Sequence, residues 1–157
     1  MRRPASIFLL ALLAGPAGAQ LPVEAHPNQT ELLPSADAQI AANKRLAFDF
    51  WREVIQARHA DKASAYVAES FVEHDAAGGN GRDALVAAVG RRPPVPVKAT
   101  IDDLVSLVAE RDVVVLAFRR ELPDLEHEGQ TYTTTSFAML RIAAGKIVER
   151  WTSGADD

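Results

Sequence analysis

The chain has 157 residues, a formal net charge of −4 and no cysteine. This length fits one domain, and the mildly acidic balance argues against nucleic-acid binding, which needs clustered positive charge. The lack of cysteine excludes disulfides and any thiol nucleophile, so the hydrophobic core alone has to stabilise the domain.

The first residues have the pattern of a secretory signal peptide. Arg2 and Arg3 precede an apolar run over 7–14, and small residues follow at 17–19. The run is shorter than the ~20 residues of a membrane anchor, and its flanks are typical of a cleaved signal. We expect cleavage before Gln20, which removes 19 of 157 residues, leaves 138 and changes the net charge to −6. The expected location is periplasmic or secreted, without membrane association after cleavage.

The segment 20–36 is predicted to be a flexible linker. It contains Pro22, Pro27 and Pro34 and shows neither a helix nor a strand period. Proline and turn residues without hydrophobic periodicity are typical of linkers, so we expect the folded domain to occupy residues 37–157.

Three helices are predicted in the first half of this domain. Over about 37–59 the apolar residues recur at i, i+3, i+4, i+7 and i+8, which is typical of an amphipathic helix. Asp61 suits the N-cap of a second helix that ends near Ser70. A third helix is predicted from Arg82 to about Val89, where a glycine and, shortly after, two prolines stop it.

The remaining pattern indicates β-strands. A short strand over 71–75 separates the second and third helices, and a glycine-rich turn follows it. Four longer strands are predicted after the third helix, at 97–109, 113–121, 130–142 and 146–153. Helices followed by an antiparallel run of strands predict an α+β domain with the helices on one side of the sheet.

Four short segments, taken in order, are characteristic of one protein family. They are FVEHD at 71–75, GRDAL at 81–85, YTTTSFAMLR at 132–141 and GKIVERW at 145–151. Over about residues 43–153 the chain resembles the SnoaL-like polyketide cyclase family of the NTF2-like superfamily. The resemblance implies a cone, in which a curved antiparallel sheet and about three N-terminal helices surround one pocket. It also implies a small-molecule ligand and a homodimer.

The chain differs from these relatives at positions that matter for chemistry. The resemblance places the acid/base pair of the ring-closing enzymes at Ala138 and Thr152, and Arg150 stands where histidine is common. None of these three side chains exchanges a proton at neutral pH, whereas aldol condensation needs a base and a donor. We therefore expect that the aldol mechanism of the relatives is lost. The sequence alone does not decide whether the chain is an enzyme.

His74 is the candidate catalytic residue. It matches a histidine of the relatives' strand and lies in the sequence between Glu73 and Asp75. A neighbouring carboxylate can orient an imidazole as a general base, which suits an isomerase, hydratase or lyase step. Adjacent residues of a strand point to opposite faces, so the alternative is a half-buried histidine that orders the turn.

The candidate ligand-binding residues are hydroxyl-bearing and amphipathic side chains on the predicted pocket face. They are Tyr66, Tyr132, Thr134, Ser136, Trp151 and Thr152. Such side chains pair an apolar body with a hydrogen-bonding tip and suit a moderately polar ligand, although they can equally fill the cone. The four histidines share no ligand spacing, so we expect neither a metal nor a cofactor.

Two classes of function follow from this pattern. The first is small-molecule binding in the pocket, with proton transfer centred on His74. The alternative is a non-catalytic dimerisation or interaction module, for which one strand face offers Thr133, Thr135, Phe137 and Met139. An open cavity favours the first class, and a cone filled by large apolar side chains favours the second.

Overall fold

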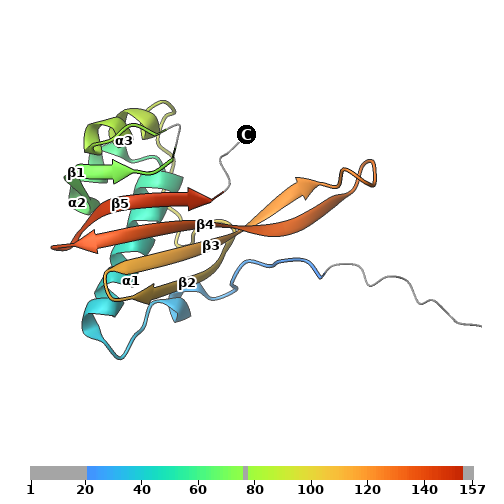
Figure 1. Ribbon diagram of the computed structural model, residues 1–157, viewed down its shortest axis with the longest axis horizontal. Coiled ribbons are helices and arrows are strands. Elements are labelled where there is room, and N and C mark those ends of the chain that lie inside the picture. The colour runs from blue at the N-terminus through green and yellow to red at the C-terminus, as the bar shows by residue number, and fades with distance from the viewer. Residues whose placement is uncertain (1–20, 76–77, 154–157) are drawn as a thin grey trace, which may run out of the picture.

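The computed structural model describes residues 21–75 and 78–153. The signal peptide expected at 1–19 lies outside the described residues. Within the described ranges, no helix is long and apolar enough to cross a membrane. These residues form one sheet with helices packed against it (Figure 1).

Five strands form a single curved sheet in the order β1-β5-β4-β3-β2 (Figure 1). The strands are β1 (Val67–Glu73), β2 (Leu104–Glu110), β3 (Val113–Pro123), β4 (Thr131–Ala143) and β5 (Lys146–Ser153). β1 runs parallel to β5, and every other neighbouring pair is antiparallel. The predicted α+β fold with a curved sheet is confirmed.

The long helix α1 (Ala38–Phe50) crosses one face of this sheet (Figure 1). It begins where the sequence predicts, because the Asp37 carboxylate accepts hydrogen bonds from the backbone N–H groups of the first turn. The helix then widens into a π-helical segment, η2 (Trp51–Gln56). A short 3₁₀ turn, η3 (Ala60–Lys62), leads into α2 (Ala63–Tyr66).

The remaining helix, α3 (Arg82–Val89), has the predicted bounds and packs near β1 (Figure 1). The core lies between the helices and the inner face of the sheet. Its largest fully buried side chains are Phe50, Val54, Val67, Phe71, Ile101, Leu104, Leu107, Val114, Leu116, Leu140 and Ile147.

The second predicted helix is shorter than expected. It ends at Tyr66, and β1 starts at Val67 rather than at Phe71. Val67 and Phe71 are both buried, and a spacing of four residues fits one face of a helix and one face of a strand equally well. The apolar pattern therefore does not separate the two structures here.

The strand predicted over 97–109 is also shorter, because β2 begins only at Leu104. Asp103 has a positive φ of 58°, which interrupts an extended backbone. Before that point, the Arg52 and Gln56 side chains donate hydrogen bonds to the carbonyls of Lys98 and Thr100. The α1–η2 helix, rather than a neighbouring strand, satisfies these backbone groups.

The segment expected to be a flexible linker is docked on the domain over much of its length. It contains a 3₁₀ turn, η1 (Gln29–Leu32), and the buried Leu33. The buried Gln29 amide bonds to both backbone groups of Ile101, at 2.7 and 2.8 Å, and the backbone of His26 bonds to Leu104. A few specific contacts hold this arm, and they leave no periodic signal in the sequence.

The hairpin of β3 and β4 extends well beyond the body of the domain (Figure 1). The two strands stay paired as far as Pro123 and Thr131. Leu125 in the connecting loop is 96% exposed. Only the part of this hairpin nearer the body can contribute side chains to a site under the sheet.

Candidate functional site

A cavity of about 320 Å³ lies between the inner face of the sheet and the helices. Its walls come from η2, α3, the segment just after β1, the middle of β3 and β4, and the C-terminal half of β5. The lining residues are Trp51, Ile55, Asp75, Leu85, Ala88, Val89, Phe118, Ser136, Phe137, Ala138, Arg150, Thr152 and Ser153. The cavity is therefore open, as the first class of function requires.

Strand register explains which β-residues face the cavity. Ala138 is paired with Leu116 on one side and with Thr152 on the other, and Ser136 is paired with Phe118. Paired residues of adjacent strands lie on the same face of a sheet. The inner face of β4 and β5 thus presents the methyl group of Ala138 and the hydroxyls of Ser136 and Thr152.

One wall of the cavity is apolar and aromatic. The Trp51 ring stacks on Phe118 with centroids 4.7 Å apart and planes 28° apart. Ile55 and Leu85 add aliphatic surface from η2 and α3. Trp51 and Ile55 both belong to the π-helical segment, a form that is rare in proteins and often found at functional sites.

Another part of the lining is polar and carries charge. The Thr152 hydroxyl donates to Asp75 Oδ2 at 3.0 Å. Arg150 donates to Glu73 Oε2 through Nε at 2.6 Å and through Nη2 at 2.5 Å. Of this pair, the Glu73 side chain is only 3% exposed and that of Arg150 is 17% exposed.

The backbone around the polar wall is shaped to hold Glu73. A Cβ on Gly78 would collide with Glu73 Cγ, so a residue with a side chain does not fit there without a shift. The backbone N–H of Glu73 donates to the Asn80 side chain at 3.0 Å. The glycine-rich turn thus makes room for a buried carboxylate and secures the strand that carries it.

The predicted site residues are divided between the cavity and other places. Ser136 and Thr152 line the cavity, beside Ala138. Tyr66 lies in the helical layer and donates to Glu53 at 3.0 Å. Burial and this bond to a carboxylate raise the pKa of Tyr66 to about 12. Tyr66 is absent from the described residues that line the cavity.

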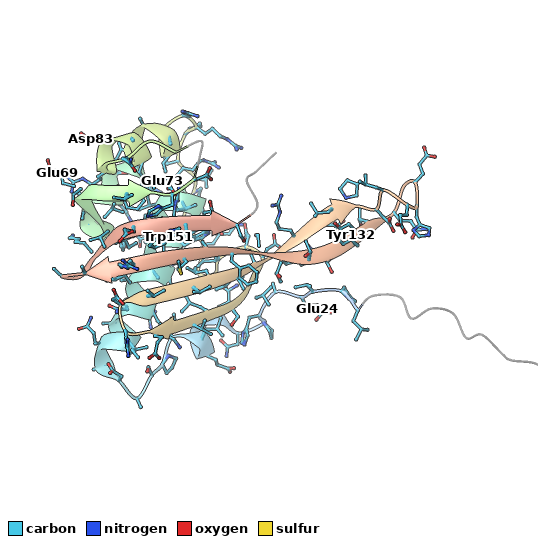
Figure 2. The ribbon with its side chains drawn as sticks, in the orientation of Figure 1. Glu24, Glu69, Glu73, Asp83, Tyr132 and Trp151 are labelled. Carbon is cyan, nitrogen blue, oxygen red and sulfur yellow. The ribbon has the colours of Figure 1, made fainter. Side chains whose placement is uncertain are left out.

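Tyr132 and Thr134 lie on the earlier part of β4, towards the hairpin extension. Figure 2 shows Tyr132 far from Glu73 and Trp151. Tyr132 is 41% exposed and lines a separate surface groove with Pro22. The structure does not bring these two residues together with Ser136 and Thr152 around the cavity.

His74 and Trp151 lie together outside the cavity, towards the outer face of the sheet. Their rings stack with centroids 4.4 Å apart and planes 4° apart. His74 Nε2 is 2.9 Å from Glu149 Oε2, and the guanidinium of Arg141 lies 5.4 Å from the Trp151 ring centroid. His74 is thus engaged with a carboxylate and an aromatic ring on the side away from the cavity.

Three functional candidates were not selected from the sequence: Glu73, Asp75 and Arg150. The signal was present in the alternation of FVEHD, because Glu73 and Asp75 share a parity and His74 has the other. Arg150 has the same parity as Thr152, which the sequence did place on the pocket face. Histidine is the most common general base in proteins, so the sequence interpretation favoured His74 over the two carboxylates beside it.

No metal site is visible in the described ranges: they contain no group of three or more His, Cys, Asp or Glu side chains that could hold an ion. The two carboxylates nearest the cavity are already engaged, Glu73 by Arg150 and Asp75 by Thr152. The arrangement can accept hydrogen bonds or a proton through Asp75 and donate hydrogen bonds through hydroxyls.

Comparison with known proteins gives a family and a set of similar folds. The sequence profile of the SnoaL-like domain matches residues 48–150. No curated protein is significantly similar to the chain.

Several solved structures share the fold. A candidate polyketide cyclase from Acidithiobacillus ferrooxidans has 15% identity and a TM-score of 0.51, over 76% of this chain and 90% of that one. A protein of unknown function with a cystatin-like fold from Xanthomonas campestris has 17% identity and a TM-score of 0.50, over 73% and 91%. At these identities the likeness shows the fold alone.

Proposed function

Because the chain belongs to the SnoaL-like domain family, whose profile covers residues 48–150, we propose that it binds a small organic molecule in the cavity and transfers a proton to or from it. The substrate contacts both the aromatic and the polar part of the lining. We further propose that the protein acts after export, in the periplasm or the medium, as its N-terminal signal pattern indicates.

One observation carries this proposal: a carboxylate, hydroxyls and aromatic rings together line one open cavity. Asp75 bonded to Thr152 and Trp51 stacked on Phe118 all belong to its lining. Concave, mainly apolar sites with a few convergent polar groups are the usual form of small-molecule sites. This geometry favours ligand binding over the alternative of a purely structural interaction module.

Asp75 is the proposed proton acceptor in place of His74. It lines the cavity, and the hydroxyl of Thr152 fixes the orientation of its carboxylate. A carboxylate base held in this way can take a proton from a carbon next to a carbonyl, and return it elsewhere on the substrate. That sequence of steps describes an isomerase, and with loss or gain of water a lyase or hydratase.

Binding can be tested with the uncharged fluorescent probe N-phenylnaphthylamine. We expect the probe to brighten with the wild-type protein, because an apolar wall excludes water from it. Ala138→Leu should abolish the increase, since its longer side chain projects into the cavity. Ala143→Leu, at an exposed position of the same strand, is the matched control. Equal brightening by both variants would contradict binding in the cavity.

Proton transfer can be tested without knowing the natural substrate. The α-protons of β-tetralone exchange with deuterium oxide, and NMR follows the rate. We expect the wild-type protein to accelerate this exchange and Asp75→Asn to lower the acceleration by about 100-fold or more, the usual worth of a general base. Glu149→Gln, which removes a carboxylate from the outer face of β5, should have no effect. Unchanged exchange in Asp75→Asn would remove Asp75 from the proposal.

A further inference from the structure

We propose that Arg150 is a substrate-binding residue: its guanidinium donates a hydrogen bond to a carbonyl oxygen of the ligand. This inference rests on the proposed binding site and names both the residue that orients the ligand and the chemical group that the site recognises. It follows from the way in which the Arg150 side chain is held at the cavity.

Arg150 reaches the cavity from β5. It has the same strand parity as Thr152, and both residues line the cavity. Its Cα partner on β4 is Leu140, which is fully buried in the core under the sheet. The Arg150 side chain is only 17% exposed although it carries a charge. A charged side chain in such a place needs a fixed partner.

That partner is Glu73 on the neighbouring strand β1. The two residues are paired in the parallel register of β1 and β5. Nε and Nη2 of Arg150 contact Glu73 Oε2, at 2.6 and 2.5 Å. The Glu73 side chain is 3% exposed, and Glu73 is not among the described residues that line the cavity. The carboxylate therefore fixes the guanidinium without itself belonging to the cavity wall.

This pairing leaves donors of the guanidinium for a ligand. An arginine carries five N–H groups in a rigid plane, and Nε and Nη2 form one edge of that plane. Glu73 occupies this edge, so Nη1 points away from Glu73. Within residues 21–75 and 78–153, Nη1 makes no hydrogen bond or ion pair. Because Arg150 lines the cavity, its remaining donors are the ones that a bound molecule can reach.

A guanidinium held in this way suits a carbonyl oxygen. Glu73 already balances its charge, so the ligand does not have to bring a negative charge of its own. When a proton leaves the carbon next to a carbonyl, negative charge moves onto the oxygen, and a donor that is already in position stabilises it. Trp51 stacked on Phe118 provides apolar surface for the rest of the molecule. The ligand class is therefore a carbonyl compound with an apolar body.

The test compares two probes that share one skeleton, β-tetralone and tetralin, which differ only in the carbonyl group. Displacement of N-phenylnaphthylamine gives their affinities. The variants are Glu73→Gln and the double variant Glu73→Gln/Arg150→Met, which differ from each other only at residue 150. Arg150→Met alone is avoided, because it would leave a buried carboxylate without its partner.

We expect Glu73→Gln to prefer β-tetralone over tetralin at least about tenfold more strongly than the double variant does, since a hydrogen bond from a charged group contributes roughly that factor. The acceleration of deuterium exchange in β-tetralone should be about 100-fold lower in the double variant, the usual effect of removing a donor that stabilises an oxyanion. Arg141→Met, which removes a guanidinium that lies over Trp151 outside the cavity, should change neither quantity relative to the wild-type protein.

A measurement on the wild-type protein keeps the test decisive if the variants do not unfold cooperatively. The infrared carbonyl band of bound β-tetralone should lie at a lower frequency than in cyclohexane, because a hydrogen bond to a cationic donor weakens the C=O bond. A band at the position found in cyclohexane would overturn the inference, because it would show that no donor contacts the oxygen.

The outcomes separate this inference from the proposed function. If N-phenylnaphthylamine does not bind to the wild-type protein, the binding site itself is wrong and the role of Arg150 falls with it. If the dye binds but Glu73→Gln and the double variant show the same preference between the two probes, the site stands and the role of Arg150 is overturned. If the wild-type protein fails to accelerate exchange, proton transfer is wrong, whereas the affinities still decide whether Arg150 holds the carbonyl oxygen.

Discussion

At the scale of single residues, the carboxylate that lines the cavity is Asp75, which lies two residues after the end of β1. The family resemblance implies an acid/base pair at Ala138 and Thr152, but neither side chain is ionisable at neutral pH. Asp75 accepts a hydrogen bond from Thr152, so a carboxylate is present in the cavity although it comes from the segment after β1. The cavity therefore contains an ionisable carboxylate although these two strand positions offer none.

Tyr66 gives a prediction for high pH. Its pKa is raised to about 12 by burial and by its bond to Glu53, so the neutral phenol is favoured in the folded protein. In the unfolded chain a tyrosine titrates near about 10. The stability that Tyr66 contributes is thus complete below about pH 10 and is lost as the pH rises towards about 12.

The measurement is a pH titration of phenolate absorbance together with urea unfolding. Tyr66→Phe should remove the transition near pH 12 and flatten the loss of stability above about pH 10. Tyr132→Phe, on the exposed hairpin extension, should keep that transition. A Tyr66 that titrates like a free tyrosine would show that its ring is not buried.

At the scale of elements, the docked arm is held by side-chain contacts instead of strand pairing. The Gln29 side-chain amide bonds to both the N–H and the C=O of Ile101, as the backbone of a neighbouring strand would do. The arm also reaches β4, where the backbone N–H of Val23 donates to the Thr133 hydroxyl at 2.6 Å. The arm therefore belongs to the folded unit that surrounds the cavity.

Gln29→Ala should lower the free energy of unfolding by about 1–3 kcal/mol, because it leaves two buried backbone groups of Ile101 without partners. Urea denaturation followed by circular dichroism measures this change. The control is Gln130→Ala, at an exposed position of the hairpin, with an expected change below about 0.5 kcal/mol. Equal stability of the two variants would mean that the contacts of Gln29 do not hold the arm against the domain.

At the scale of the whole molecule, the parts with a strong local pattern were predictable. α3 and β5 have the predicted bounds, because glycine and proline stop the helix and alternating residues after a short turn define the strand. Ser136 was placed on the cavity by strand alternation, and Thr152 by the family resemblance. Asp75 was not, since its role depends on how β1 meets β5, a contact between residues about 77 positions apart.

Export is a prediction for the whole chain. Expressed in a Gram-negative host, the protein should appear in the periplasmic fraction with a mass that corresponds to a first residue of Gln20. Ala19→Leu should retain the signal segment, because the cleaving enzyme requires a small residue at that position. A full-length protein in the cytoplasm of cells that carry the wild-type sequence would contradict the prediction.

The two tryptophans of the chain occupy opposite sides of the sheet. Trp51 stands at the cavity beside Phe118, and Trp151 stacks against His74 outside it. Replacing Trp151 with phenylalanine would leave only the tryptophan fluorescence of Trp51 at the cavity. Replacing Trp51 would leave only the fluorescence of Trp151 outside it. The domain thus contains two separate optical reporters, one for occupancy and one for events on its outer surface, and needs no added dye for either.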